Sequence, residues 1–199
     1  ELYNYRELRP RLAADGFRPV RCEERPGLRA LWRSLRAGEG YLAPGGPAAG
    51  AQPPEGWEET LRGAGLFRWG DLDAWPYMAP RLRLLLSRRF PALRTAADRI
   101  VRALPRLAPR AVLVDEDTTE FKRLLVLLCG RRGVPSVVAQ HGVPLKPLGF
   151  VPMRAARMAV WGDASRRRLA AWGVPASRMR VPLTLRPATA KAMAMRWSW

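Results

Sequence analysis

The sequence predicts an α/β fold with a doubly wound, Rossmann-like parallel sheet. Short apolar runs such as Ala111 to Val114 alternate with amphipathic helical segments between residues 109 and 181. This is the order of elements in a parallel sheet with right-handed crossovers. A run that is apolar at every position is typical of a strand covered on both faces. Polar turns follow these runs, at the strand ends where such folds bind their ligands.

Composition limits the class of protein. The chain has 199 residues, of which 48% are hydrophobic, enough for one substantial core. No charge-free run of about 18 apolar residues occurs, so we expect no membrane-spanning helix. The chain opens at Glu1 without a signal-peptide pattern, from which we expect no secretion and a start that has been cut. Cys22 and Cys129 lack metal-ligand spacing and are expected to be buried free thiols.

The net charge of +18 leaves three interpretations open. Of the 35 basic residues only three are lysine, and the arginines are spread through nearly every segment. A GC-rich coding sequence produces such an excess without selection for binding. Attraction to a membrane surface or to phosphates is the second interpretation, and nucleic acid is the third. The spread of the arginines makes nucleic acid the least favoured partner.

Residues 1–65 form a poorly defined segment that we assign to the same domain as the rest. The pattern predicts a strand over 17–22 and an amphipathic helix over 27–37. Glycine and proline make up about half of residues 38–56, which predicts a flexible loop.

Residues 66–181 are expected to form the Rossmann-like core. The aromatic-rich segment 66–77 is expected to pack in a core, with a part in an acceptor site as the alternative. Pro80 suits the first turn of a helix that runs to Phe90, where Pro91 ends it and starts the next. That next helix carries an apolar stripe that includes Ile100 and Leu104.

Four strands are expected over 111–114, 135–139, 158–161 and 178–181. Asp117 followed by Glu120 resembles a capping box, and it predicts the start of a helix that ends near Gly130. A second helix is expected over 163–172, closed by Gly173.

Three polar turns should converge at the carboxyl edge of this sheet, at residues 115–117, 140–142 and 162–163. His141 is the chain's single histidine. Its imidazole could act as general base toward a hydroxyl or as a partner of a phosphate, or it could bond only to its own loop. Gln140 could orient it, and Gly142 would let the backbone turn or approach a ligand.

Other charged residues give weaker signals. Asp115 and Asp117 have the spacing of a metal motif, but helix starts favour acidic residues regardless of function, so we expect neither metal nor cofactor. Lys146 could neutralise a phosphate or be a solvated loop residue. Residues 166–168, three arginines in a row, are expected on the solvated face of their helix, with membrane contact as the alternative.

The stretch 109–181 resembles the later half of the amino-terminal domain of GT-B-type proteins. It contains QHGV at 140–143, GFVP at 149–152 and MAVWGDASRRRLAAWGVPASRMRV at 158–181. The relatives are bacterial surface-carbohydrate glycosyltransferase-like proteins, akin to capsule polysaccharide and glycerophosphotransferase enzymes. The resemblance implies one half of a GT-B fold, with His141 and Gly142 in the interdomain cleft and the histidine activating the acceptor. HGVPLK at 141–146 is similar to the His-Gly-x-Pro-x-Lys run of the glycerophosphotransferases, which implies a role for Lys146.

The resemblance ends at Val181. Residues 182–199 contain no acidic residue and none of the glycine-containing turn with which such proteins continue. We therefore expect an irregular tail, truncated or frame-shifted, and poor catalysis by this chain alone.

The function expected is transfer of a sugar or sugar-phosphate from a nucleotide-sugar donor to a glycan or lipid-linked acceptor in surface polysaccharide biosynthesis. The resemblance implies a cytoplasmic location, with peripheral contact at the inner face of the membrane left open. The catalytic residue would be His141, and the substrate-binding residues would be Gln140, Gly142, Lys146, Asp115 and Gly162. Two alternatives remain: a non-hydrolysing UDP-sugar 2-epimerase-like enzyme, and a basic nucleic-acid-binding or non-catalytic fragment.

Overall fold

The computed structural model describes residues 8–24, 27–36, 40–44 and 52–181. The tail 182–199 and part of the expected loop 38–56 lie outside the described residues. Within the described ranges, none of the helices is long and apolar enough to cross a membrane.

The amino-terminal segment forms a small β-α-β unit. After α1 (Leu8–Ala14), strand β1 (Val20–Cys22) leads through α2 (Leu28–Arg36) to β2 (Gly40–Leu42), which pairs with β1 in parallel. The expected strand and helix are confirmed, but β2 lies in the range for which we predicted a loop throughout. Glycine at position 40 serves strand pairing here, since a Cβ atom would lie 3.0 Å from Cγ2 of Val20.

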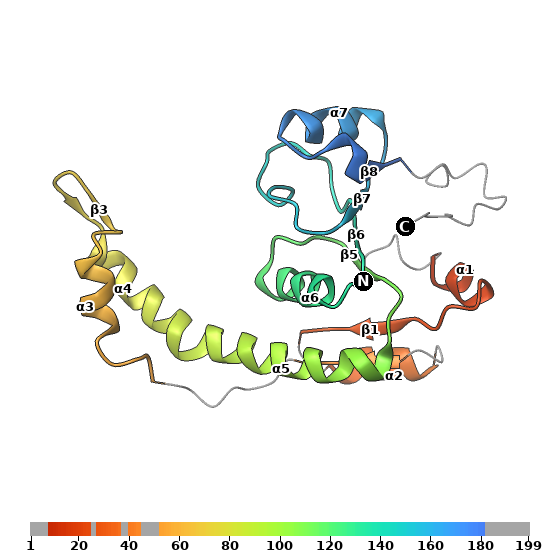
Figure 1. Ribbon diagram of the computed structural model, residues 1–199, viewed down its shortest axis with the longest axis horizontal. Helices are drawn as coiled ribbons and strands as arrows, with labels where there is room; N and C mark the ends of the chain where they lie inside the picture. The colour runs from red at the N-terminus through yellow and green to blue at the C-terminus, as the bar shows by residue number, and fades with distance from the viewer. Residues whose placement is uncertain (1–7, 25–26, 37–39, 45–51, 182–199) are drawn as a thin grey trace.

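The next elements extend away from the sheets. They are α3 (Trp57–Gly63), the hairpin of β3 (Arg68–Trp69) and β4 (Leu72–Asp73), α4 (Trp75–Leu84), the π-helical turn η2 (Leu85–Arg89) and α5 (Phe90–Leu107). Figure 1 shows α4, η2 and α5 as one continuous, curved rod with the hairpin at its far end. We call residues 57–89 the arm.

The expected break at Pro91 is wrong, because the helix widens there instead of ending. The amide of Phe90 donates to the carbonyl of Leu85, five residues back. A proline ring inside an α-helix lacks a donor and clashes with the carbonyl four residues earlier. A single π turn before Pro91 provides a wider turn at this point, and the chain continues as a helix.

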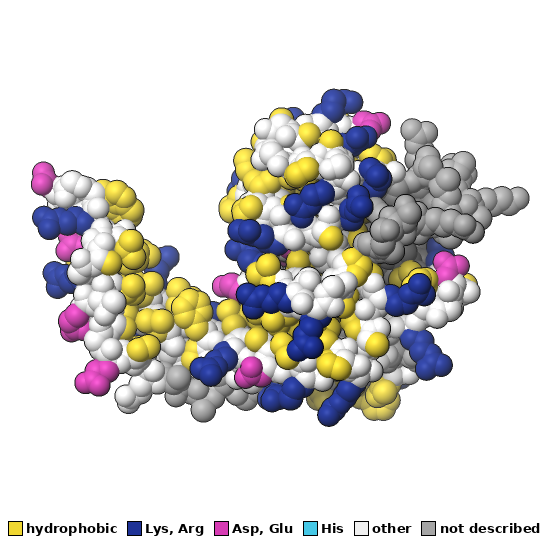
Figure 2. Space-filling view, in the orientation of Figure 1, with side chains coloured by type: hydrophobic (Ala, Val, Ile, Leu, Met, Phe, Trp, Pro, Cys, Tyr) yellow, Lys and Arg dark blue, Asp and Glu magenta, His cyan; other side chains and the backbone are white. Residues whose placement is uncertain are grey.

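The aromatic segment of the arm is mostly exposed. The exposed fraction is 60% or more for four of its residues, Leu66, Trp69, Leu72 and Tyr77. The expectation of core packing is therefore wrong for these four. Trp75, in contrast, is buried. Its ring centroid lies 6.0 Å from that of Trp57 and 5.9 Å from that of Phe67. In Figure 2, hydrophobic side chains gather along the side of the arm that faces the hollow between arm and sheet.

The main sheet contains β5 (Val112–Val114), β6 (Ser136–Ala139), β7 (Arg157–Ala159) and β8 (Met179–Arg180), all parallel and in that order. Helix α6 (Glu120–Arg131) joins the first two strands, and α7 (Asp163–Ala171) with a 3-10 turn, η3 (Ala176–Arg178), joins the last two. The four expected strands are confirmed to within two residues. The mixed α/β architecture with a parallel sheet is compatible with a Rossmann-like fold. Between β6 and β7 an irregular segment, 140–156, replaces the helix of a regular crossover.

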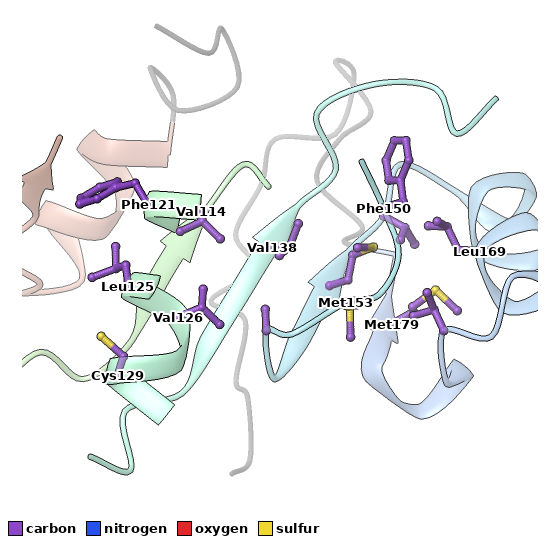
Figure 3. Packing of buried hydrophobic residues seen from close by; sticks show 14 of the residues in the cluster. Val114, Phe121, Leu125, Val126, Cys129, Val138, Phe150, Met153, Leu169 and Met179 are labelled. Atoms are coloured by element: carbon purple, nitrogen blue, oxygen red, sulfur yellow. The ribbon is translucent and has the colours of Figure 1, made fainter. Parts of the chain in front are cut away.

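One row of side chains across the sheet forms the centre of the core. Val114, Val138, Met158 and Met179 are in register, and each is at most 6% exposed. Figure 3 shows α6 residues beside Val114 and Val138, and Leu169 of α7 beside the far strands. Leu113, on the opposite side of β5, is 40% exposed, so the expectation that this strand is covered on both faces is wrong.

Asp117 does not cap α6. Thr119 precedes the helix, and no side chain caps its first amides. The carboxylate of Asp117, which is 1% exposed, accepts hydrogen bonds from the amides of Arg154 and Ala155 at 2.5 and 2.6 Å. It therefore fastens the irregular segment 140–156 to the end of β5.

Both cysteines are free thiols, but only Cys129 is buried as expected, whereas Cys22 is partly buried. Burial, together with the nearby Cys129 and Glu23, raises the pKa of Cys22 to about 12, and burial raises the pKa of Cys129.

A thiol whose pKa is higher in the folded than in the unfolded state stabilises the fold at pH values below the unfolded-state pKa. This stability is lost as the pH rises toward the folded-state pKa. We expect the free energy of unfolding to fall by about 1 kcal/mol more between pH 9 and 10 in the unaltered protein than in Cys22→Ala. Urea titrations under reducing conditions measure this, and equal losses in both proteins would contradict it.

Candidate functional site

The candidate site lies at the carboxyl edge of the main sheet. Asp115 follows β5, Gln140 and His141 follow β6, and Gly162 follows β7 by three residues. Parallel strands bring these turns to one edge. Hydrogen bonds join the first turn to the second and the second to the third.

His141 is fixed in one orientation. Its Nδ1 lies 3.0 Å from the carbonyl oxygen of Asp115. Because a carbonyl only accepts hydrogen bonds, the neutral ring carries its proton on Nδ1 and leaves the lone pair on Nε2. One face of the imidazole stacks on Phe150, with ring centroids 4.9 Å apart and planes 10° from parallel. Phe150 is itself buried, so the histidine ring rests on a rigid apolar surface.

The space beside Nε2 is open. Gly149 has φ of +92°, a conformation that side chains rarely adopt. A Cβ atom there would lie 4.0 Å from Nε2 of His141 and within 4 Å of no other heavy atom outside its neighbours. A glycine at this position therefore leaves room for a small group next to the unprotonated nitrogen.

Gln140 joins two of the turns. The side chain is 1% exposed. Its Oε1 accepts from the amide of Trp161 at 2.8 Å, and its Nε2 donates to the carbonyl of Gly142 at 2.7 Å and to Oγ of Ser165 at 3.1 Å. With every polar atom bonded, Gln140 holds the backbone around His141 in place.

Charges at the site are paired. Nζ of Lys122 lies 2.7 Å from Asp115 and 2.9 Å from Glu116. Partial burial disfavours the ammonium form, but the two carboxylates outweigh it and raise the pKa of Lys122. The described residues contain no group of three or more acidic, histidine or cysteine side chains placed to hold a metal.

The other expected binding residues occupy different places. Gly142 contributes its carbonyl to Gln140, and Gly162 precedes α7 in an extended conformation that any residue adopts. Lys146 is exposed and has no hydrogen bond or salt bridge with the described part of the chain. The structure thus joins Asp115, Gln140, His141 and Gly142 through direct contacts and leaves Lys146 outside them.

Four residues of the site were not predicted from the sequence: Lys122, Gly149, Phe150 and Ser165. Lys122 and Ser165 each lie in the first turn of a helix that follows a predicted strand. This position next to the carboxyl edge of the sheet could have identified them from the sequence. Gly149 and Phe150 lie in the irregular segment, where no periodic pattern applies.

A cavity of about 480 Å³ lies elsewhere, lined by residues that include Met153, Trp172 and Arg178. The guanidinium of Arg178 donates to the carbonyls of Ala155 and Ala156. The cavity does not include His141.

Comparison with models of protein families, with curated proteins and with solved structures found no match to this chain.

Proposed function

We propose that this chain is the acceptor-side half of a GT-B-like glycosyltransferase and that His141 is its general base. The observation that carries the proposal is the Nδ1 contact with the carbonyl of Asp115 at 3.0 Å, which assigns the lone pair to Nε2. The position at the carboxyl edge of a parallel sheet and the sequence resemblance support it. The proposal includes the substrates, which are a nucleotide-sugar donor and a glycan or lipid-linked acceptor.

The reaction requires one proton transfer. Nε2 of His141 takes the proton of an acceptor hydroxyl while the oxygen attacks the donor carbon or phosphorus. The new bond to oxygen forms as the bond to the nucleotide leaving group breaks. The resulting imidazolium keeps its Nδ1 hydrogen bond to Asp115, and Gln140 acts as a positioning residue.

The ring tautomer tests the geometry without an activity assay. His141 is the only histidine in the sequence, so its two ring nitrogens give the only imidazole signals in a nitrogen-15 NMR spectrum. We expect the neutral ring to be protonated on Nδ1, because that nitrogen lies 3.0 Å from a carbonyl oxygen. A neutral ring protonated on Nε2 would remove the proposed base.

Product analysis tests the reaction. The intact gene product, given a labelled nucleotide sugar, should release nucleotide and transfer the label only when a hydroxyl acceptor is present. Conversion of the donor sugar without any acceptor would indicate an epimerase instead.

A further inference from the structure

The loop that follows His141 exposes three aliphatic side chains. Val143, Leu145 and Leu148 are 60%, 77% and 74% exposed. The loop is nevertheless anchored, because Pro144 is buried, its carbonyl accepts from Nη1 of Arg168 at 3.2 Å, and the amide of Leu145 donates to Val143 at 2.9 Å. We call residues 143–148 the apolar loop.

An anchored loop with its aliphatic side chains outward is suited to an apolar contact. Single exposed hydrophobic residues are common, but three in six residues on a fixed backbone form a patch. They are aliphatic, so they lack the aromatic faces on which bases of nucleic acids stack. The patch therefore favours a hydrocarbon environment over single-stranded nucleic acid.

Basic side chains border the apolar loop. Lys146 lies within it, and Arg168 touches it from α7. Successive residues of a helix are about 100° apart, so Arg166 and Arg168 lie on opposite flanks of the core-facing residues Ser165 and Leu169. Arg167 lies on the solvent side midway between them. The loop contains no acidic residue.

We propose that the apolar loop inserts into the surface of an anionic lipid bilayer, with Lys146 and Arg168 at the level of the phosphate groups. Aliphatic side chains beside cationic ones are the combination that binds membrane interfaces. This mode of contact needs no spanning helix. The inference concerns a surface rather than the chemistry of His141, so it holds or fails independently of the proposed function.

Vesicle flotation tests the proposal on the full chain. The probes are vesicles of phosphatidylcholine alone and vesicles with about one third phosphatidylglycerol. We expect binding to the anionic vesicles only, and a loss of about tenfold or more in Leu145→Asn/Leu148→Asn. Arg168→Gln should weaken binding severalfold, and Arg166→Gln, which removes the same charge from the opposite flank of α7, should change it less.

A matched control separates the loop from general charge attraction. Leu66 and Leu72 lie on the arm and are 60% and 61% exposed. Leu66→Asn/Leu72→Asn keeps the net charge and should leave vesicle binding unchanged. Equal binding by the loop variant and the unaltered protein overturns the proposal, as does an equal loss in the arm variant. Tighter binding to a single-stranded oligonucleotide, insensitive to the loop substitutions, overturns it in favour of nucleic acid.

Discussion

Under the proposed function, replacing His141 with alanine is expected to lower transferase turnover by about a hundredfold or more. Removal of a positioned general base typically costs two to four orders of magnitude. Substrate binding should change little, because no other polar contact of the site depends on the imidazole. Steady-state kinetics with saturating nucleotide sugar measures the effect as a fall in kcat.

His141→Asn is the matched variant for this experiment. Its side-chain amide can still donate to the carbonyl of Asp115, but it places no basic nitrogen where Nε2 lies. A base role predicts that both variants lose turnover to a similar degree. Turnover near the original value in His141→Asn would reduce the histidine to a positioning residue.

Asp117→Ala is expected to lower the free energy of unfolding by about 3 kcal/mol. The substitution removes the acceptor of two amides, those of Arg154 and Ala155, and Ala155 is fully buried. A buried donor left without a partner costs about 1–3 kcal/mol. Urea unfolding should show a lower midpoint with an unchanged slope.

Asp98 provides the control for Asp117. It is an exposed carboxylate on α5, and Asp98→Ala should change stability by less than about 0.5 kcal/mol. A similar small change in Asp117→Ala would show that the segment 140–156 keeps its place without this carboxylate.

The sequence was sufficient where a local pattern coincides with burial. The strands that hold Val114, Val138 and Met158 are short apolar runs, and the stripe with Ile100 and Leu104 faces the core as expected. Prediction failed where a distant contact overrides a local rule. Asp117 has the spacing of a helix cap, yet its oxygen bonds to amides 37 and 38 residues away. Likewise, Pro91 has the position of a helix break, but one wide turn accommodates it.

The candidate site shows the same division. Its position was predictable, because the carboxyl ends of parallel strands share an edge and polar residues such as Asp115 and His141 follow the strands. The stacking of Phe150 on His141 and the space at Gly149 were not predictable. Both depend on how an irregular segment folds back over the sheet, and that segment has no periodicity to interpret.

The uninterrupted rod of α4, η2 and α5 fixes a spacing. Its length of 33 residues corresponds to about 50 Å at the rise of an α-helix. A molecule bound at the hairpin would lie at most about this distance from the end of α5 next to β5, because the helix is curved but no loop interrupts it. The helix thus sets an upper limit on the distance between the hairpin and the main sheet. The wide turn before Pro91 keeps the helix continuous over this length.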